Sequence, residues 1–144
     1  MLVAKVDDKY LIRLDRNEEI LSSLKTICQK HKIKAGKVSG IGAVYDVSLG
    51  FYDLPTKFYD SKKFEGEFEL LSLSGNISFL DGEPFTHLHM TMSDANYQVF
   101  GGHLFSAKIA VTGEIWIVPA EIDVERVQND EIGLNLMSFS GESI

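Results

Sequence analysis

The sequence predicts an α+β domain in which one main helix packs on a mainly antiparallel β-sheet. Apolar residues at helical spacing occur in one stretch, residues 20–28, whereas the chain beyond Gly36 consists of alternating or β-branched segments separated by polar turns. The 144 residues contain no linker, internal repeat or low-complexity segment, and their number is that of one ordinary domain. We therefore expect a single domain over residues 1–144.

Two short strands are expected before the helix, at residues 2–6 and 9–14, joined by an acidic turn. The helix is predicted from one buried stripe, which consists of Ile20, Leu21, Leu24, Ile27 and Cys28. Asp15 with Glu18 three residues later resembles a capping box at the start of this helix. Gly36 is a suitable residue to stop it.

Further strand segments are expected beyond the helix, mostly in hairpin order, for a total of seven or eight. They lie at residues 37–44, 45–53, 64–80, 86–93, 97–105 and 108–118. Pro119 ends the last of them, because proline cannot donate a hydrogen bond within a sheet. The tail from Glu121 has the pattern of a short strand or a turn, and we leave it unassigned.

The charge of the chain argues against a nucleic-acid partner. Lys and Arg number 14 and Asp and Glu number 21, which gives a net charge of -7, and the basic residues are scattered. A protein that holds nucleic acid through its phosphates needs a basic face. We therefore expect no direct binding of nucleic acid.

Cysteine content and hydropathy predict the compartment. Cys28 is the only cysteine, so no intramolecular disulfide can form and a reducing compartment is the simplest inference. The most apolar run, residues 109–118, is interrupted by Glu114 and is too short to span a bilayer. We expect a cytoplasmic protein without a membrane segment.

The candidate site is a cluster of histidines. Three of the four histidines in the chain, His87, His89 and His103, fall within residues 86–104. Alternate residues of a strand share a face, so His87 and His89 project together. If the polar turn that follows is centred on Asn96, His89 lies directly opposite His103 and His87 lies on the diagonal.

This register depends on the parity of the loop. A loop with an even number of residues would pair His89 with residue 102 or 104 and turn His103 to the other face. Gly101 and Gly102 could also hold a bulge that shifts the register either way. A three-histidine site therefore requires an odd loop or a compensating bulge.

Three neutral imidazoles suit zinc, copper, nickel or iron. Zinc is the first choice because it accepts three histidines plus water, and no fourth protein ligand is visible in the sequence. The open position could be filled by a ligand or a partner chain, or it could activate water in a metal-dependent enzyme. In the enzyme alternative, whose substrate would be small and polar, the acid–base candidates are Glu67, Glu69 and Asp94.

Two motifs resemble those of a known family. The first is GEFELLSLSGNIS at Gly66–Ser78, and the second is HLHMTMSDANYQVFGGHL at His87–Leu104. They resemble the G-R-F-E-I-L-S-L-S-G signature of the plants-and-prokaryotes conserved domain, the PPC domain, and the H-x-H, polar turn, G-G-H pattern of its bacterial and archaeal branch. With VSGIGAVYDVSLGFYD and TGEI, which also fit, the resemblance covers about residues 3–127.

This resemblance implies a PPC-like α+β fold, a homotrimer, and a metal held by His87, His89 and His103. In plant members the domain follows AT-hook motifs and contacts transcription factors, but this chain has no R-G-R-P hook and has Glu67 in place of the signature Arg. The DNA-associated roles are therefore disfavoured. We expect a stand-alone metal-binding module with a small-molecule or protein partner, and a metal-dependent enzyme is the alternative. A cupin shares Gly82 followed by the H-x-H pair, but the downstream Glu of that family is absent.

Overall fold

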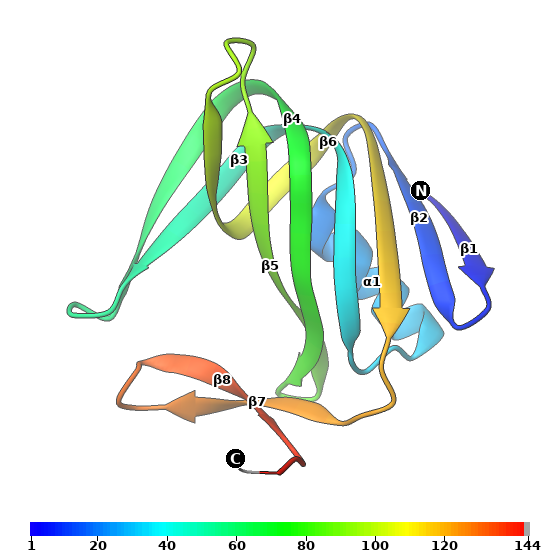
Figure 1. Cartoon of the computed structure of the whole chain (residues 1–144), viewed down its shortest axis with the longest axis vertical. Helices are drawn as coiled ribbons and strands as arrows, with labels where there is room; N and C mark the ends of the chain where they lie inside the picture. The colour runs from blue at the N-terminus through cyan, green and yellow to red at the C-terminus, as the bar shows by residue number, and fades with distance from the viewer. Residues whose placement is uncertain (143–144) are drawn as a thin grey trace.

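The computed structural model describes residues 1–142, which form eight strands and one helix (Figure 1). In chain order the elements are β1 (Leu2–Val6), β2 (Lys9–Asp15), α1 (Ile20–His31), β3 (Gly36–Asp53), β4 (Phe58–Leu80), β5 (Glu83–Ser93), β6 (Val99–Pro119), β7 (Val124–Asn129) and β8 (Leu134–Phe139). Neighbouring strands pair antiparallel apart from one parallel contact between β4 and β7. The predicted α+β class is correct in outline, although the fold is mostly β.

Three strands are longer than the sequence predicted. β3, β4 and β6 contain 18, 23 and 21 residues. Segments 37–44 and 45–53 are one strand, and segments 97–105 and 108–118 also join into one, which begins at Val99. The apparent breaks lie beside shifts in register, at Tyr45/Val47 in the β3–β4 ladder and at Tyr45/Ser48 in the β3–β6 ladder. Such irregularities bend a strand without ending it.

The bent strands close into a ring. β3 pairs with β4 and β6, and β5 pairs with the same two strands. β2 and then β1 continue the sheet beyond β6. In Figure 1 the turn between β3 and β4 reaches away from the rest of the sheet at the lower left.

The helix covers one face of the sheet and builds the core with it. Leu24, Ile27 and Cys28 of α1 are buried in the same cluster as Ile12 of β2 and Ile115 of β6. Burial also raises the pKa of the Cys28 thiol to about 12, so this cysteine is an inert core residue. Within residues 1–142, no helix combines the length and apolar character that a bilayer crossing requires.

Both ends of α1 differ from the prediction. The N-cap is Glu19, whose carboxylate accepts hydrogen bonds from the backbone N–H groups of Leu21 and Ser22. Only half of the predicted capping box forms, because the Glu18 carboxylate accepts from the Asp15 N–H at 2.8 Å but Asp15 is the last residue of β2. The helix ends at His31, the C-cap residue Lys32 adopts a left-handed conformation with φ of 56°, and Gly36 begins β3 instead.

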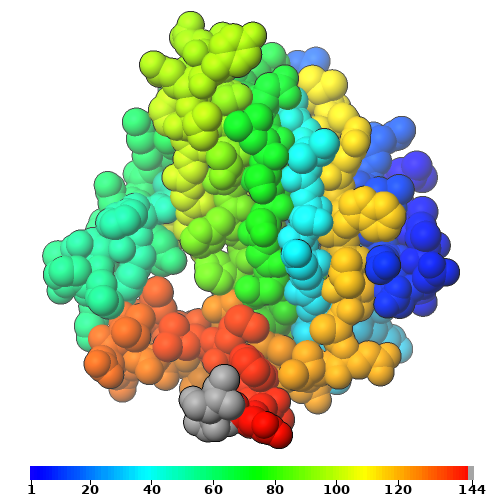
Figure 2. Space-filling model, viewed as in Figure 1, coloured from blue at the N-terminus to red at the C-terminus, as the bar shows by residue number. Residues whose placement is uncertain are grey.

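The unassigned tail forms a β-hairpin, β7–β8. Its two strands pair with each other over their full length, and the strand pairing with the main sheet is limited to one residue pair, Phe79 with Glu125. Figures 1 and 2 show this hairpin lying across the bottom of the molecule, beneath β5 and the end of β4. It thereby faces the strand that carries two of the predicted metal ligands.

Candidate metal centre

Strand β5 turns its histidines away from the core. Leu88, Met90 and Met92 are at most 1% exposed and pack in the core cluster. Because side chains alternate along a strand, His87 and His89 lie on the opposite face. His87 is half-buried there and His89 is exposed.

The turn between β5 and β6 has an odd number of residues. Ser93 pairs with Val99, which leaves the five residues 94–98 in the loop. The Asp94 carboxylate holds this loop by accepting from the backbone N–H groups of Asn96 and Gln98, both at 2.9 Å. The predicted register is confirmed, because His89 pairs with His103.

His103 lies where the ring of strands closes. Its backbone is paired with His89 on one side and with Gly50 of β3 on the other. A Cβ at Gly50 would overlap the ring of Phe105, so glycine leaves room for the aromatic side chains beside His103. Phe105 and Tyr59 flank the His103 imidazole, each with its ring centroid 5.1 Å away. Neither aromatic residue belongs to a motif that pointed to the site.

The three imidazoles converge on one point. Their ring centroids lie 5.1 to 5.6 Å apart, and one nitrogen of each lies within 4.8 Å of the others. Nitrogens around a tetrahedral zinc lie about 3.4 Å apart, given Zn–N bonds of about 2.0–2.1 Å. Side-chain rotations that move the nitrogens by about an ångström would therefore bring the three imidazoles to the spacing of zinc ligands. Among residues 1–142, no other group of His, Cys, Asp or Glu side chains converges in this way.

The surroundings keep two of the imidazoles neutral. Burial lowers the pKa of His87 to about 4, and the positive charge of Arg126 and the neighbouring histidines add to this effect. Burial also lowers the pKa of His103, followed by the effects of His89 and Arg126. Neutral imidazole is the form that binds a metal, so neither ring needs to release a proton near neutral pH.

One nitrogen of the cluster lacks a partner. Nδ1 of His103 is buried without a hydrogen bond, and it is the only such side-chain atom in the part of the chain that the structure describes. A buried polar atom without a partner costs about 1–3 kcal/mol. The residues therefore fit a metal ion, which would turn a set of neutral, partly unsatisfied nitrogens into ligands.

A cation borders the cluster. Arg126 of β7 is half-buried, and its Nη2 lies 3.3 Å from Nδ1 of His87. The same nitrogen donates to the side-chain oxygen of Asn76 at 3.0 Å. Arg126 was not predicted as a site residue because it lies in the unassigned tail, 23 residues beyond His103, and belongs to no motif.

The acidic residues of the enzyme alternative lie elsewhere. Glu67, Glu69 and Asp94 line a cavity of about 310 Å³ beside the β5–β6 turn, and the three histidines do not line it. Asp94 follows His89 by five residues, which is roughly 16 Å along an extended strand. The structure brings these carboxylates near one another but not to the histidines.

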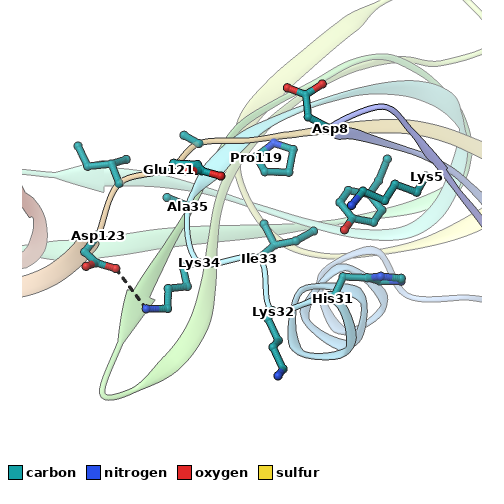
Figure 3. A pocket seen from close by; sticks show the side chains of 13 residues that line it. Lys5, Asp8, His31, Lys32, Ile33, Lys34, Ala35, Pro119, Glu121 and Asp123 are labelled. Atoms are coloured by element: carbon teal, nitrogen blue, oxygen red, sulfur yellow. Dashed lines mark hydrogen bonds and ion pairs between the residues drawn. The ribbon is translucent and has the colours of Figure 1, made fainter.

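The fourth histidine is also separate from the cluster. His31 ends α1 and packs its ring 4.8 Å from that of Tyr10. It lines a cavity of about 550 Å³ between α1, β1 and the segment after β6 (Figure 3). The lining of this cavity mixes cations with anions, including the Lys34–Asp123 ion pair at 3.4 Å. His31 therefore provides an internal control for the cluster.

Residues 1–121, which include α1 and strands β1 to β6, match the Plants and Prokaryotes Conserved (PCC) domain. The chain belongs to this family. The resemblance seen in the two sequence motifs is thereby confirmed. The β7–β8 hairpin lies beyond the part of the PCC chain that matches the family.

Solved structures with the same fold include three of similar length. A candidate DNA-binding protein of Bacteroides thetaiotaomicron is 33% identical, with 96% of both chains covered and a TM-score of 0.92. A PPC protein of Pyrococcus horikoshii is 30% identical, with 99% of this chain and 96% of that chain covered and a TM-score of 0.86. A metal-containing protein of Archaeoglobus fulgidus is 34% identical, with 94% and 97% covered and a TM-score of 0.85.

A curated relative is much longer. The bifunctional protein GlmU of Synechococcus sp. (strain JA-2-3B'a(2-13)) is 31% identical over 96 residues. These residues are 66% of this chain but 14% of that protein. The match therefore concerns a small part of the larger protein.

Proposed function

We propose that this PCC-domain chain is a metal-binding module that holds one zinc ion through His87, His89 and His103. The observation that carries the proposal is the convergence of three imidazole nitrogens within 4.8 Å of one another, together with the unpartnered Nδ1 of His103. The similar protein of Archaeoglobus fulgidus is described as metal-containing, which supports the same conclusion. A bound zinc would supply a Lewis-acidic position to which a small ligand or a partner chain can bind.

Elemental analysis of the zinc content tests this proposal. Protein loaded with zinc and then desalted should retain about one equivalent per chain, and a variant with His87, His89 and His103 all changed to Ala should retain none. His31→Ala is the matched control, because it removes the one histidine outside the cluster and should leave the zinc content unchanged. The same measurement reports whether another divalent transition metal is preferred. Equal zinc in the triple variant and the native chain would refute the site.

We also propose that the chain forms a homotrimer, as the family resemblance implies. Three apolar side chains on β3, β4 and β6 support self-association: Ile41, Leu71 and Val111 are 55%, 47% and 69% exposed and line one shallow cavity. Exposed apolar patches of this kind mark interaction surfaces. Light scattering at micromolar concentration should give three times the chain mass, and a monomer would contradict the proposal.

A pair of charged variants tests which surface makes the trimer. Val111→Glu should dissociate it, because a carboxylate would be buried without a partner. Val127→Glu places the same charge on the β7–β8 hairpin, where Val127 is 55% exposed, and should leave the mass unchanged. Dissociation by Val127→Glu alone would place the interface on the hairpin instead.

A metal-dependent enzyme is the second candidate, and the exposure of His89 favours it because solvent reaches the site from that side. This function predicts that zinc-loaded protein hydrolyses a small activated ester or phosphate ester, and that the triple alanine variant does not. The carboxylates expected to act as acid and base do not line the site. A metal-bound hydroxide would therefore have to act without them.

Direct binding of DNA is disfavoured for this chain. Two similar structures, from Bacteroides thetaiotaomicron and Ralstonia eutropha, are described as candidate DNA-binding proteins. The net charge here is -7, and several exposed cations are paired with carboxylates, among them Arg13, Lys25, Lys34 and Lys108. Fluorescence anisotropy with a labelled duplex should show no binding at 10-fold below physiological salt, where phosphate contacts are strongest.

A further inference from the structure

The guanidinium of Arg126 is fixed beside the histidine cluster by contacts that do not involve it. Nε donates to the Ser78 hydroxyl at 3.1 Å, and Nη1 donates to the Asn135 carbonyl at 3.2 Å. Nη2 donates to Asn76 at 3.0 Å, and the guanidinium carbon stands 5.3 Å from the ring centroid of Phe85. These contacts from β4, β5 and β8 hold the planar group in one orientation.

The second N–H of Nη2 has only His87 as its partner, with 3.3 Å between Nη2 and Nδ1. A neutral imidazole has one nitrogen with a lone pair and one N–H. If Nδ1 accepts from Arg126, Nε2 carries the proton and cannot bind a metal. If His87 binds a metal through Nδ1, the lone pair is used, and if it binds through Nε2, Nδ1 carries the proton. Metal binding by His87 therefore ends its hydrogen bond with Arg126 in every case.

The freed N–H then stands next to the metal with no anionic protein group to receive it. Among residues 1–142, Arg126 forms no ion pair. Arginine remains protonated in proteins, and the three histidines contribute no negative charge. A divalent metal beside Arg126 would thus create three formal positive charges in a half-buried site, which requires an anion from solution.

We propose that Arg126 makes the metal-loaded site a receptor for a small oxyanion, a carboxylate or a phosphate. One oxygen of the anion would occupy the open coordination position and another would accept from Nη2 of Arg126. This inference rests on the proposed zinc site and specifies the class of its ligand. A planar guanidinium suits this task because it binds carboxylate and phosphate oxygens with fixed geometry.

The position of Arg126 in the chain adds to the inference. The three histidines lie within the residues that match the PCC domain, whereas Arg126 lies in the hairpin beyond residue 121. The metal ligands and the anion-binding group therefore come from different parts of the chain. His89 is exposed, so the cluster is open to solvent at this histidine and an anion can enter there.

The test compares the zinc-loaded native chain with Arg126→Met and with the control Arg13→Met. Met keeps an unbranched side chain that replaces the aliphatic part of Arg but removes its charge and donors, and Arg13 is an exposed arginine on β2 whose loss changes the net charge equally. Calorimetric titration with inorganic phosphate and, separately, acetate measures anion affinity. We expect Arg126→Met to lower the anion affinity by about tenfold or more, since a hydrogen bond to a charged group is lost. Arg13→Met should match the native chain.

Zinc affinity, measured by chelator competition with and without the anion, separates the two proposals. The anion should raise the zinc affinity of the native chain by the same factor by which zinc raises its anion affinity, and Arg126→Met should lose this coupling while retaining zinc. Equal anion binding by a zinc-loaded Arg126→Met would overturn the role of Arg126 and leave the zinc site standing. A native chain that binds no zinc would overturn both. Should Arg126→Met fail to fold, Arg126→Lys replaces it, because it keeps the charge but loses the forked geometry.

Discussion

The side chains on the two faces of β5 differ in burial and in role, although they belong to the same backbone. On one face Leu88, Met90 and Met92 are at most 1% exposed and pack under α1 and its sheet. On the other face His87 and His89 form the candidate site with His103. Alternation along one strand therefore separates the residues that stabilise the fold from those that can do chemistry. Variants on the two faces should affect the free energy of unfolding very differently.

The largest loss of stability is expected on the core face. Leu88→Ala removes a fully buried side chain and should lower the free energy of unfolding by about 2–5 kcal/mol. Urea denaturation of the metal-free protein measures this loss. Thr91→Ala, on the outer face of the same strand, is the control and should cost less than about 1 kcal/mol. A loss below about 1 kcal/mol for Leu88→Ala would contradict the separation of the two faces into stabilising and functional residues.

A change in the neighbouring strand should affect both the stability of the fold and the zinc affinity of the site. A Cβ at Gly75 of β4 would overlap the backbone carbonyl of His87, so Gly75→Ala must push β4 and β5 apart. We expect a loss of about 1–3 kcal/mol, as for other overpacked sites, and a weaker zinc affinity. Gly101→Ala is the milder comparison, because its added carbon would stand 3.1 Å from the Met90 oxygen. Unchanged zinc affinity in Gly75→Ala would show that His87 does not move with its backbone.

Acid should destabilise the outer face selectively. The lowered pKa values of His87 and His103 mean that the unfolded chain binds more protons than the folded chain between about pH 6.5 and 4. The free energy of unfolding of metal-free protein should therefore fall as pH is lowered through this window, by about 1 kcal/mol once solvent screening is included. Urea titrations at pH 7.5 and 4.5 measure the slope. Changing both histidines to Gln should remove the part of this pH dependence that comes from their titration.

The smallest effect on stability should accompany one of the largest effects on binding. His89 is exposed, so His89→Ala should change the free energy of unfolding of metal-free protein by no more than about 0.5 kcal/mol. Zinc affinity should nevertheless fall by at least about 100-fold, because loss of a ligand costs more than loss of a supporting hydrogen bond. Parallel chemical denaturation and chelator competition check both values. A large loss of stability would assign His89 to the fold.

The site could be predicted from sequence to the extent that it is local. His87, His89 and His103 share one hairpin, and the polar residues between them indicated its turn, but the parity of the loop and the register were settled only by the pairing of Ser93 with Val99. Arg126 could not be inferred, because it meets His87 only through the tertiary placement of the hairpin. The same distinction applies to the aromatic ring of Tyr59, which reaches His103 from the far end of β4.

The elements of the fold were predictable where their boundaries depend on local chemistry. The buried stripe of α1 was correct, but its start was not, because Glu19 caps the helix and sequence rules favour smaller residues there. β3 and β6 were each predicted as two segments, with divisions after Val44 and after Phe105. Only the pairing on both sides of β3 shows these divisions to be points where a continuous strand bends.

The closure of the strand ring at His103 has a consequence for the order of folding. β6 is the last of the four ring strands in the chain, and its residue 103 must reach both residue 50 and residue 89. Contacts between residues so distant in sequence form slowly, because a long loop must be ordered before they stabilise the chain. A chain that stops before β6 would carry two of the three cluster histidines but no site. Zinc would therefore bind only to chains in which the ring has closed, and would draw the folding equilibrium toward that state by mass action.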